Sequence, residues 1–437
     1  MMNKLHKLVN QGLVSYYLLQ LRKDQWKDPR QLKNIQFKKL KAIIKHAYTY
    51  VPYYHRKFSS ANIKPEAIKN FDDIKRIPLI SKRNIQKNYR DFIVQGIDES
   101  KLTSRVTSGS TGIPLKLISD SSVSPSSSKY QFFECGVKSR DNFVTVWGRG
   151  AESIRWGSKY VRLWGDISET FVPLFPEETL IEVLRRINPD VLLTFPSVLS
   201  TLANYDLSGI NPRLIFTQGE MVTEHCRDIV KKKLNLELFE TYGSVEFGGL
   251  AFECNEHCGL HMITDVAYLE FVDEEGEQVS PGERGEIIVT GLYNHAMPLI
   301  RYRIGDSGIP SDEKCPCGRS WPLIKSIEGR INDYCVLPSG RKISWLYLLR
   351  FILYDEKFKR NVFSISQYQI IQERKNRIIF KVVKGTTFDP EILERIKNKI
   401  ETSFAKQGEN LEVAVQLVKE IPMERTGKRR LFISKLN

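Results

Sequence analysis

Long hydrophobic runs are missing from this 437-residue chain. No apolar stretch reaches the roughly 18 residues that a membrane-spanning helix needs. The first residues lack both the compact apolar core and the small-residue cleavage site of a signal peptide. A nucleic-acid-binding motif and an internal repeat are also missing. We therefore expect a cytoplasmic globular protein of two or three domains that does not bind nucleic acid.

Acidic residues are too few to balance the basic ones. The chain has 66 Lys and Arg against 51 Asp and Glu, and its net charge is +15. Most of the excess lies in residues 1–100, which hold 21 Lys and Arg and 8 Asp and Glu. Such a basic region fits a weak contact with an anionic membrane surface, and it also fits a solvated helix surface. The composition leaves both interpretations open.

Cysteine is sparse, with seven residues in the whole chain, so a disulfide framework is not expected. Four of the seven form two close pairs. Cys254 and Cys258 lie in FECNEHCGLHM, and Cys315 and Cys317 lie in KCPCG. A Cys-x-Cys turn followed by glycine is suited to chelation, and the first segment adds imidazoles. A tetrahedral structural zinc site is the interpretation we prefer, and reduced thiols without a metal are the alternative.

Alternating strand and helix patterns in the middle of the chain predict an α/β fold with a parallel sheet. We expect helices at 177–187, 197–205 and 223–234, and strands at 190–195, 213–217 and 236–240. Ligands of such sheets bind beyond the carboxyl ends of the strands. The segments at those ends are 195–197, 218–220 and 241–244.

The flanking regions have other patterns. An N-terminal helix is expected to bury Leu40, Ile43, Ile44 and Ala47 and to end at Val51-Pro52, with a second helix near 66–76. Short strands over 262–310 predict a small antiparallel β subdomain. Beyond Gly329, a β-β-α-β pattern predicts a separate small domain. The expected division is a large domain, 1–329, and a small α+β domain, 330–437.

A glycine- and hydroxyl-rich loop, VTSGSTGIPLKL, occupies residues 106–117. Its glycines let several N–H groups point toward one place, and its hydroxyls add donors, an arrangement that suits a polyphosphate. The residue order differs from that of a Walker A loop. Composition alone is equally typical of a flexible surface loop, so ATP binding has to be inferred from other segments.

Four later segments accompany this loop in a fixed order. They are FETYGSVEFGG at 239–249, MPLIRYRIGD at 297–306, IEGRINDY at 327–334 and MERTGKRRLF at 423–432. The five together resemble the adenylate-forming superfamily of acyl-CoA synthetases, in particular the phenylacetate–CoA ligases and the CapK-type proteins of capsular polysaccharide gene clusters. HAYTYVPYYHRKF at 46–58 is similar as well. The resemblance spans nearly the whole chain.

The resemblance implies roles for individual residues. Glu246 would bind Mg²⁺, and Lys428 would contact the carboxylate of the acid and the α-phosphate, with Thr111 as a third catalytic residue. Tyr242 would pack on adenine, and Asp306 would accept hydrogen bonds from the ribose. The remaining ATP contacts would be Ser108, Gly109, Ser110, Thr111, Gly112 and Lys116 at the phosphates, with Gly219, Glu220, Gly243, Ser244 and Arg330 nearby.

The chemistry of these groups is consistent with adenylation. A carboxylate attacking the α-phosphorus brings two negative charges together, so a lysine, Mg²⁺ and loop N–H groups would stabilise the transition state. The implied reaction gives acyl-AMP and pyrophosphate, followed by acyl transfer, with CoA expected as the acceptor. The alternatives are transfer of the acyl group or AMP to a sugar, amine or hydroxyl, and a nucleotide-binding module without turnover.

The resemblance also bears on the metal site and the hinge. It selects Cys254, His261, Cys315 and Cys317 as zinc ligands, with Cys258 as a rival fourth ligand. At the hinge the family commonly has Arg-x-Asp-Asp, whereas this chain has Asn332 in the third position. The candidate residues of the acid pocket are Phe132, Trp147, Phe195 and His295.

Overall fold

The computed structural model describes residues 16–107, 115–120, 130–146, 155–161, 165–173, 177–203, 205–330, 334–345, 348, 365–423 and 429–436. The chain divides into two units, each described here by itself. The first comprises 1–139, 160–166 and 239–328, and the second comprises 140–159, 167–238 and 329–437. Within the part of the chain that the structure describes, none of the helices combines the length and apolar composition needed to traverse a bilayer.

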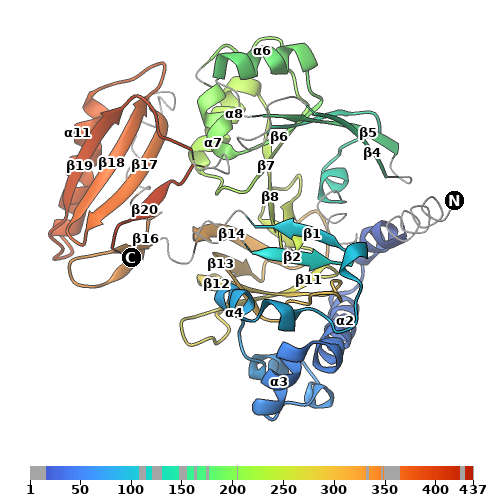
Figure 1. The fold of residues 1–437 in the computed structure, drawn as a ribbon. Coiled ribbons are helices and arrows are strands. Elements are labelled where there is room, and N and C mark those ends of the chain that lie inside the picture. Colours follow the sequence, from blue (N-terminus) through green and yellow to red (C-terminus); the bar gives the residue numbers. More distant parts are fainter. Residues whose placement is uncertain are drawn as a thin grey trace. The chain divides into compact units, whose positions relative to one another are not determined.

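The N-terminal helix of the first unit is α2 (Pro29–Tyr50), as predicted. Asp28 caps it by accepting a hydrogen bond from the N–H of Arg30, and Pro29 supplies a preset first turn. The predicted apolar face is buried, and Val51 separates α2 from α3 (Pro52–Ser60). Figure 1 shows both helices in blue.

The helix predicted near 66–76 is replaced by two short 3-10 turns, η1 (Pro65–Ala67) and η2 (Asp72–Arg76). The carboxylate of Asp73 accepts hydrogen bonds from the N–H groups of Lys69 and Asn70. Such side-chain bonds compete with helical backbone bonds, which explains the difference. Shorter elements follow: α4 (Lys82–Lys87), η3 (Tyr89–Phe92) and η4 (Glu99–Lys101).

A largely antiparallel sheet forms the body of the first unit, and it contains the predicted antiparallel subdomain. Its strands lie in the order β11-β12-β13-β14-β10-β9-β8. Their bounds are β8 (Leu238–Ser244), β9 (Gly248–Glu253), β10 (Leu260–Met262), β11 (Ala267–Val272), β12 (Gly285–Gly291), β13 (Tyr302–Ser311) and β14 (Leu323–Arg330). Arg301, just before β13, forms a buried ion pair with Glu270 and donates to the carbonyls of Lys75 and Ile77, which fastens the N-terminal region to this sheet.

The second unit contains the predicted parallel sheet. β3 (Asn142–Val146) pairs in parallel with both β5 (Gly165–Val172) and β6 (Val191–Thr194), and β6 pairs with β7 (Leu214–Gln218). The connecting helices lie at the predicted segments: α6 (Glu177–Ile187), α7 (Pro196–Leu202) and α8 (Glu224–Leu234). α7 ends at Leu202, earlier than predicted, and Thr223 caps α8. β4 (Arg155–Val161) precedes β5 along the chain.

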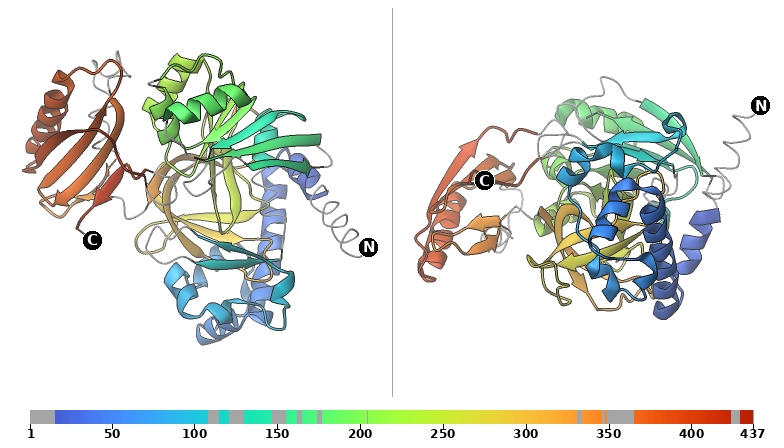
Figure 2. Two further views of the ribbon diagram at one scale, coloured as in Figure 1. Left: turned by 45° about the horizontal axis from the view of Figure 1, so that its top comes forward. Right: turned by 60° about the horizontal axis from the view of Figure 1, so that its bottom comes forward.

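The β-β-α-β pattern at the C-terminus is also confirmed. β17 (Ile365–Arg374) and β18 (Arg377–Lys384) are antiparallel, while β19 (Glu412–Val418) and β20 (Phe432–Ser434) pair in parallel with β18 and β17. α11 (Glu391–Ala405) buries Ile396, Ile400 and Phe404, and it lies along one face of the sheet (Figure 2). A small hairpin, β15 (Tyr334–Val336) and β16 (Lys342–Ser344), precedes it.

Candidate active site

The glycine-rich loop joins two paired strands in the first unit. β1 (Thr103–Val106) and β2 (Lys116–Ser119) are antiparallel, with Val106 opposite Lys116. Thr107 closes the base of the loop: its N–H donates to the carbonyl of Leu115, and its hydroxyl accepts from the N–H of Leu115. Lys116 is exposed. Ser108, Gly109, Ser110, Thr111 and Gly112 lie outside the described residues.

Two predicted nucleotide contacts are in direct contact with each other. The hydroxyl of Tyr242, on β8, donates to Oδ2 of Asp306, on β13, across 3.0 Å. Tyr242 is 8% exposed and packs in the hydrophobic core of the first unit, so it serves the core as well as this polar contact. A β-bulge between Tyr242 and Gly243 alters the register with β9 at this point.

The predicted Mg²⁺ ligand, Glu246, lies in the turn between β8 and β9. Its carboxylate accepts a hydrogen bond of 3.4 Å from the buried hydroxyl of Tyr302, and Glu246 itself is half-buried. The hydroxyl of Ser244 accepts from the N–H of Phe247 and holds the turn. A carboxylate oxygen is the kind of ligand that Mg²⁺ prefers, so these residues fit the ion.

In the second unit two of the three predicted strand ends, 195–197 and 218–220, come together around Glu220. The third, 241–244, belongs to β8 of the first unit. One carboxylate oxygen of Glu220 accepts from the N–H of Ser197 at 2.9 Å. The other accepts from the Ser197 hydroxyl at 3.0 Å and from the N–H of Arg429 at 2.7 Å. Removal of the carboxylate from water raises the pKa of Glu220, and these hydrogen bonds oppose that shift. Gly219 has a positive φ of 84°, which suits glycine.

The remaining predicted residues are distributed as follows. Arg330 is the exposed last residue of β14. Lys428, Asn332 and Trp147 lie outside the described residues. Of the acid-pocket candidates, Phe195 is fully buried in the core of the second unit, and the N–H of His295 donates to the carboxylate of Asp120. Phe132 is 9% exposed. The placement of the acid stays a prediction.

The four predicted zinc ligands form one cluster in the first unit. The ligand atoms of Cys254, His261, Cys315 and Cys317 all lie within 4.8 Å of one another. The sulfurs of Cys254 and Cys315 are 3.5 Å apart, and Cys317 Sγ is 3.4 Å from His261 Nε2. A tetrahedron with Zn–S bonds of about 2.3 Å has edges of about 3.8 Å, so the shorter separations in the cluster are near those of a zinc shell. Cys258 is exposed and donates to the carbonyl of Glu256 instead.

The surroundings of this cluster shift the pKa values of its cysteine and histidine side chains. Burial raises the pKa of the Cys254 and Cys315 thiols. Burial acts in the same direction on Cys317, but hydrogen bonds from Arg319 and the neighbouring thiols bring its pKa below the usual value. Burial, assisted by the charge of Arg319, lowers the pKa of His261 to about 4, which keeps its imidazole neutral and able to bind a metal at neutral pH.

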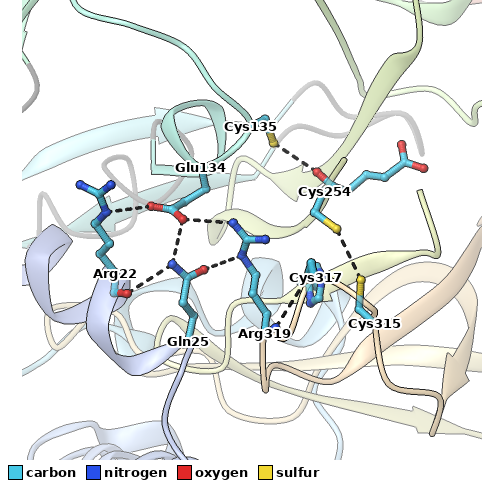
Figure 3. A network of polar contacts seen from close by, with 10 residues as sticks. Arg22, Gln25, Glu134, Cys135, Cys254, Cys315, Cys317 and Arg319 are labelled. Atoms are coloured by element: carbon cyan, nitrogen blue, oxygen red, sulfur yellow. Dashed lines mark hydrogen bonds and ion pairs between the residues drawn. The ribbon is translucent and has the colours of Figure 1, made fainter. Parts of the chain in front are cut away.

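A polar network that the sequence analysis missed lies beside this cluster (Figure 3). Arg319 donates from its main chain to Cys317 Sγ and from its guanidinium to Gln25 at 2.7 Å and Glu134 at 3.2 Å. Gln25 also donates to Glu134. The N-terminal residues are thereby attached to the cysteine loop. The only signal in the sequence was a basic residue two positions after the Cys-x-Cys pair.

Comparisons with known proteins agree with the resemblance seen in the sequence. The chain is 27% identical over 325 residues to phenylacetate-coenzyme A ligase of Escherichia coli, covering 70% of this chain and 73% of that protein. It is 25% identical over 387 residues to the protein CapK of Staphylococcus aureus, covering 83% and 81%. A family model described as the CapK C-terminal domain matches residues 350–435.

Solved structures agree on the fold. A 2-hydroxyisobutyryl-CoA ligase in its postadenylation state superposes with a TM-score of 0.78 at 16% identity, covering 95% of this chain and 92% of that one. The same ligase in complex with 2-HIB-AMP and CoA has a TM-score of 0.61 at 17% identity, covering 95% and 92%. The predicted adenylate-forming fold is thereby confirmed, and the expected ligase class agrees with the names of these relatives.

Proposed function

We propose that the protein is an ATP- and Mg²⁺-dependent ligase that adenylates a carboxylic acid and then transfers the acyl group, with CoA as the acceptor. The observation that supports this most directly is the hydrogen bond between Tyr242 and Asp306. The two residues come from separate motifs, and both were assigned to the nucleoside of ATP. The named activities of the phenylacetate-coenzyme A ligase and 2-hydroxyisobutyryl-CoA ligase relatives support the reaction class.

Each group has a distinct part in the proposed first step. The acid's carboxylate attacks the α-phosphorus of ATP, the acyl-phosphate bond forms, and pyrophosphate leaves. Tyr242 and Asp306 hold the nucleoside, while Lys428 neutralises charge that develops between the carboxylate and the α-phosphate. Glu246 would hold Mg²⁺, which supplies charge neutralisation at the phosphates when bound. No protein nucleophile is needed in this step.

A molecule other than CoA is the second candidate for the acceptor. The similarity to CapK covers more of the chain than the similarity to the phenylacetate-coenzyme A ligase, and the C-terminal model that matches is also a CapK model. These matches support an alternative, in which the acyl group or AMP is transferred to a sugar, amine or hydroxyl. A module without turnover is less well supported, because the chain has both Glu246 and Lys428.

Pyrophosphate release tests the proposal. ATP and Mg²⁺ are combined with a panel of aryl, fatty, hydroxy and amino acids, each with and without CoA. Acid-dependent release that CoA accelerates supports the ligase. Release that CoA leaves unchanged favours another acceptor, and absence of release with every acid contradicts adenylation.

The cysteine cluster supports a second part of the proposal, namely that Cys254, His261, Cys315 and Cys317 hold a structural zinc ion. Three thiolates and one imidazole complete a four-coordinate shell with no position for a substrate. The ion would stabilise the loop between β13 and β14, which follows the strand that contains Asp306. We assign it no step in the reaction.

A further inference from the structure

Tyr302, the first residue of β13, contacts the predicted Mg²⁺ ligand with its hydroxyl. The hydroxyl donates to Oε1 of Glu246 across 3.4 Å, although the two residues are 56 positions apart in the sequence. Only 2% of Tyr302 is exposed, and its ring lies in the hydrophobic core of the first unit. Glu246 is half-buried, in the turn between β8 and β9. Its carboxylate is therefore in contact with a side chain that the core holds in place.

The main chain at Tyr302 is held from two sides. Tyr302 lies opposite Val289 of β12 and also opposite Ile80, which precedes α4. Ile80 donates to the carbonyl of Arg301 at 3.0 Å and accepts from the N–H of Arg303 at 2.8 Å. These two bonds enclose Tyr302, so the point from which its side chain extends is fixed.

Arg301, the residue before Tyr302, adds a buried anchor. Its φ is 49°, which is uncommon for a residue other than glycine. Its guanidinium is paired with the carboxylate of Glu270, with Nη2 2.9 Å from one oxygen and Nε 3.1 Å from the other. It also donates to the carbonyls of Lys75 and Ile77, each at 2.8 Å. A backbone conformation of this kind persists where surrounding contacts determine it, and here they come from β11 and from the N-terminal region.

A hydroxyl held in this way can orient a metal-binding carboxylate. A tyrosine has only two side-chain torsions, so the position of its hydroxyl is set once its backbone and ring are held. A hydrogen bond from a hydroxyl to an ionised carboxylate is charge-assisted and therefore stronger than a neutral one. A carboxylate offers about four acceptor positions, so it can accept from a hydroxyl and bind a cation together. Loss of such an outer hydrogen bond typically weakens metal binding about ten- to hundredfold.

We infer that Tyr302 is a positioning residue for Mg²⁺, and that it orients the Glu246 carboxylate through the hydrogen bond to Oε1. The inference rests on the proposed function, in which Glu246 holds the ion. We assign Tyr302 no contact with the ion or with ATP, because it acts only through Glu246. Removal of its hydroxyl should therefore weaken the effect of Mg²⁺ on ATP binding and leave ATP binding without Mg²⁺ unchanged.

The test measures the dissociation constant for ATP by calorimetric titration, once with Mg²⁺ and once with a chelator. No acid is added, so adenylation does not occur. The ratio of the two constants is the factor by which Mg²⁺ strengthens ATP binding. We expect Tyr302→Phe to lower this factor about tenfold, because the carboxylate is no longer oriented, and Glu246→Gln to lower it further, because the ligand itself is lost. In the chelator, the dissociation constant of Y302F should stay within about twofold of wild type.

Tyr54→Phe is the matched control. Tyr54 is also buried in the first unit, and its hydroxyl donates to the carbonyl of Pro298 at 3.1 Å and accepts from the N–H of Ile300 at 2.9 Å. Y54F thus removes a buried hydroxyl near the start of β13 without altering the contact with Glu246. It should keep the Mg²⁺ factor within about twofold of wild type. The melting temperature should fall by similar amounts in Y54F and Y302F, so a difference between their Mg²⁺ factors reports on Glu246.

The double variant E246Q/Y302F separates positioning from a general structural effect. Because Tyr302 acts only through Glu246, adding Y302F to E246Q should cause no further loss of the Mg²⁺ factor. A wild-type factor in Y302F would overturn the inference and leave the proposed function intact, as would an additional loss in the double variant as large as that of Y302F alone. A wild-type factor in E246Q would contradict the role of Glu246 in the proposed function itself, and the inference with it.

Discussion

The Tyr242 hydroxyl and the Asp306 carboxylate, 64 residues apart in the sequence, are joined by a hydrogen bond of 3.0 Å. The tyrosine ring is held by the core on one side and by this bond at its tip. The bond therefore fixes the relative placement of an aromatic ring and a carboxylate that belong to two separate motifs.

Tyr242→Phe should raise KM for ATP about three- to tenfold and leave kcat nearly unchanged, because one neutral hydrogen bond is lost while the ring remains. Asp306→Asn should raise it about ten- to a hundredfold, since a charged acceptor is removed. Steady-state exchange kinetics at varied ATP measure both. Tyr268→Phe is the control, because that ring packs against Phe71 in the same unit. Equal effects of Y242F and Y268F would contradict the nucleoside role.

Lys428→Ala should slow adenylation at least about a hundredfold, because the lysine stabilises charge that develops at the α-phosphate. The dissociation constant for ATP should change less than about threefold, since the other phosphate contacts remain. Single-turnover pyrophosphate release and equilibrium binding separate the two quantities. Lys419→Ala, at an exposed position of the same C-terminal region, should resemble wild type. Full adenylation rates in K428A would refute the assignment.

Protein expressed without metal supplements should contain about one zinc ion per chain. Cys315→Ser should lose most of it and unfold at a lower temperature, because three remaining ligands leave an open shell. Cys258→Ser should keep both the metal and the melting temperature, since Cys258 lies outside the cluster. Elemental analysis and thermal unfolding measure these quantities. Wild-type zinc well below one equivalent would contradict the site.

Stability should fall in acid partly through His225, on α8. Burial lowers the pKa of His225 to about 4, with the backbone of Ile365 acting against the shift. In the unfolded chain the pKa of this histidine is about 6.5, so the unfolded state binds more protons between pH 4 and 6.5. The contribution of His225 to the free energy of unfolding is therefore complete above about pH 6.5 and is lost as the pH falls toward 4. Uptake of one proton on unfolding gives the free energy of unfolding a slope of up to about 1.4 kcal/mol per pH unit.

Urea unfolding at pH 4.5, 5.5, 6.5 and 7.5 measures this slope. His225→Gln should flatten it between pH 4 and 6.5, because the titrating group is absent. His55→Gln, at an exposed position, is the control and should keep the wild-type slope. An unchanged slope in H225Q would show that other groups account for the acid sensitivity.

Local patterns predicted the regular elements well. The helix predicted at 177–187 has those bounds in the structure, because its apolar spacing and charged ends are local features. The Cys-x-Cys-Gly turn indicated a chelating site, and the family resemblance selected the four residues that cluster in the structure. The exception is the segment near 66–76, where Asp73 binds the backbone of Lys69 and Asn70 and prevents a helix.

Long-range pairings were beyond reach from one sequence. Nothing near Arg319 indicated that its partners would be Gln25 and Glu134, which are 294 and 185 residues away. The contacts of Arg429 were hidden for the same reason, since Ser197 and Thr201, two of its acceptors, belong to α7 and its basic neighbours look alike in the sequence. Such contacts depend on which elements the fold brings together, and composition does not encode that directly.

The cysteine cluster has a consequence for the unfolded chain. A metal bound by Cys254 and Cys315 would cross-link positions 61 residues apart, closing a loop whose lost conformational freedom corresponds to about 4 kcal/mol in a loop-closure treatment. In the folded protein, Arg319 also donates a hydrogen bond to Gln25, which connects the cysteine loop to the N-terminal residues. The free energy of unfolding of the first unit would then depend on whether the metal is bound. In a disulfide-linked protein, it depends in the same way on oxidation of the cysteines.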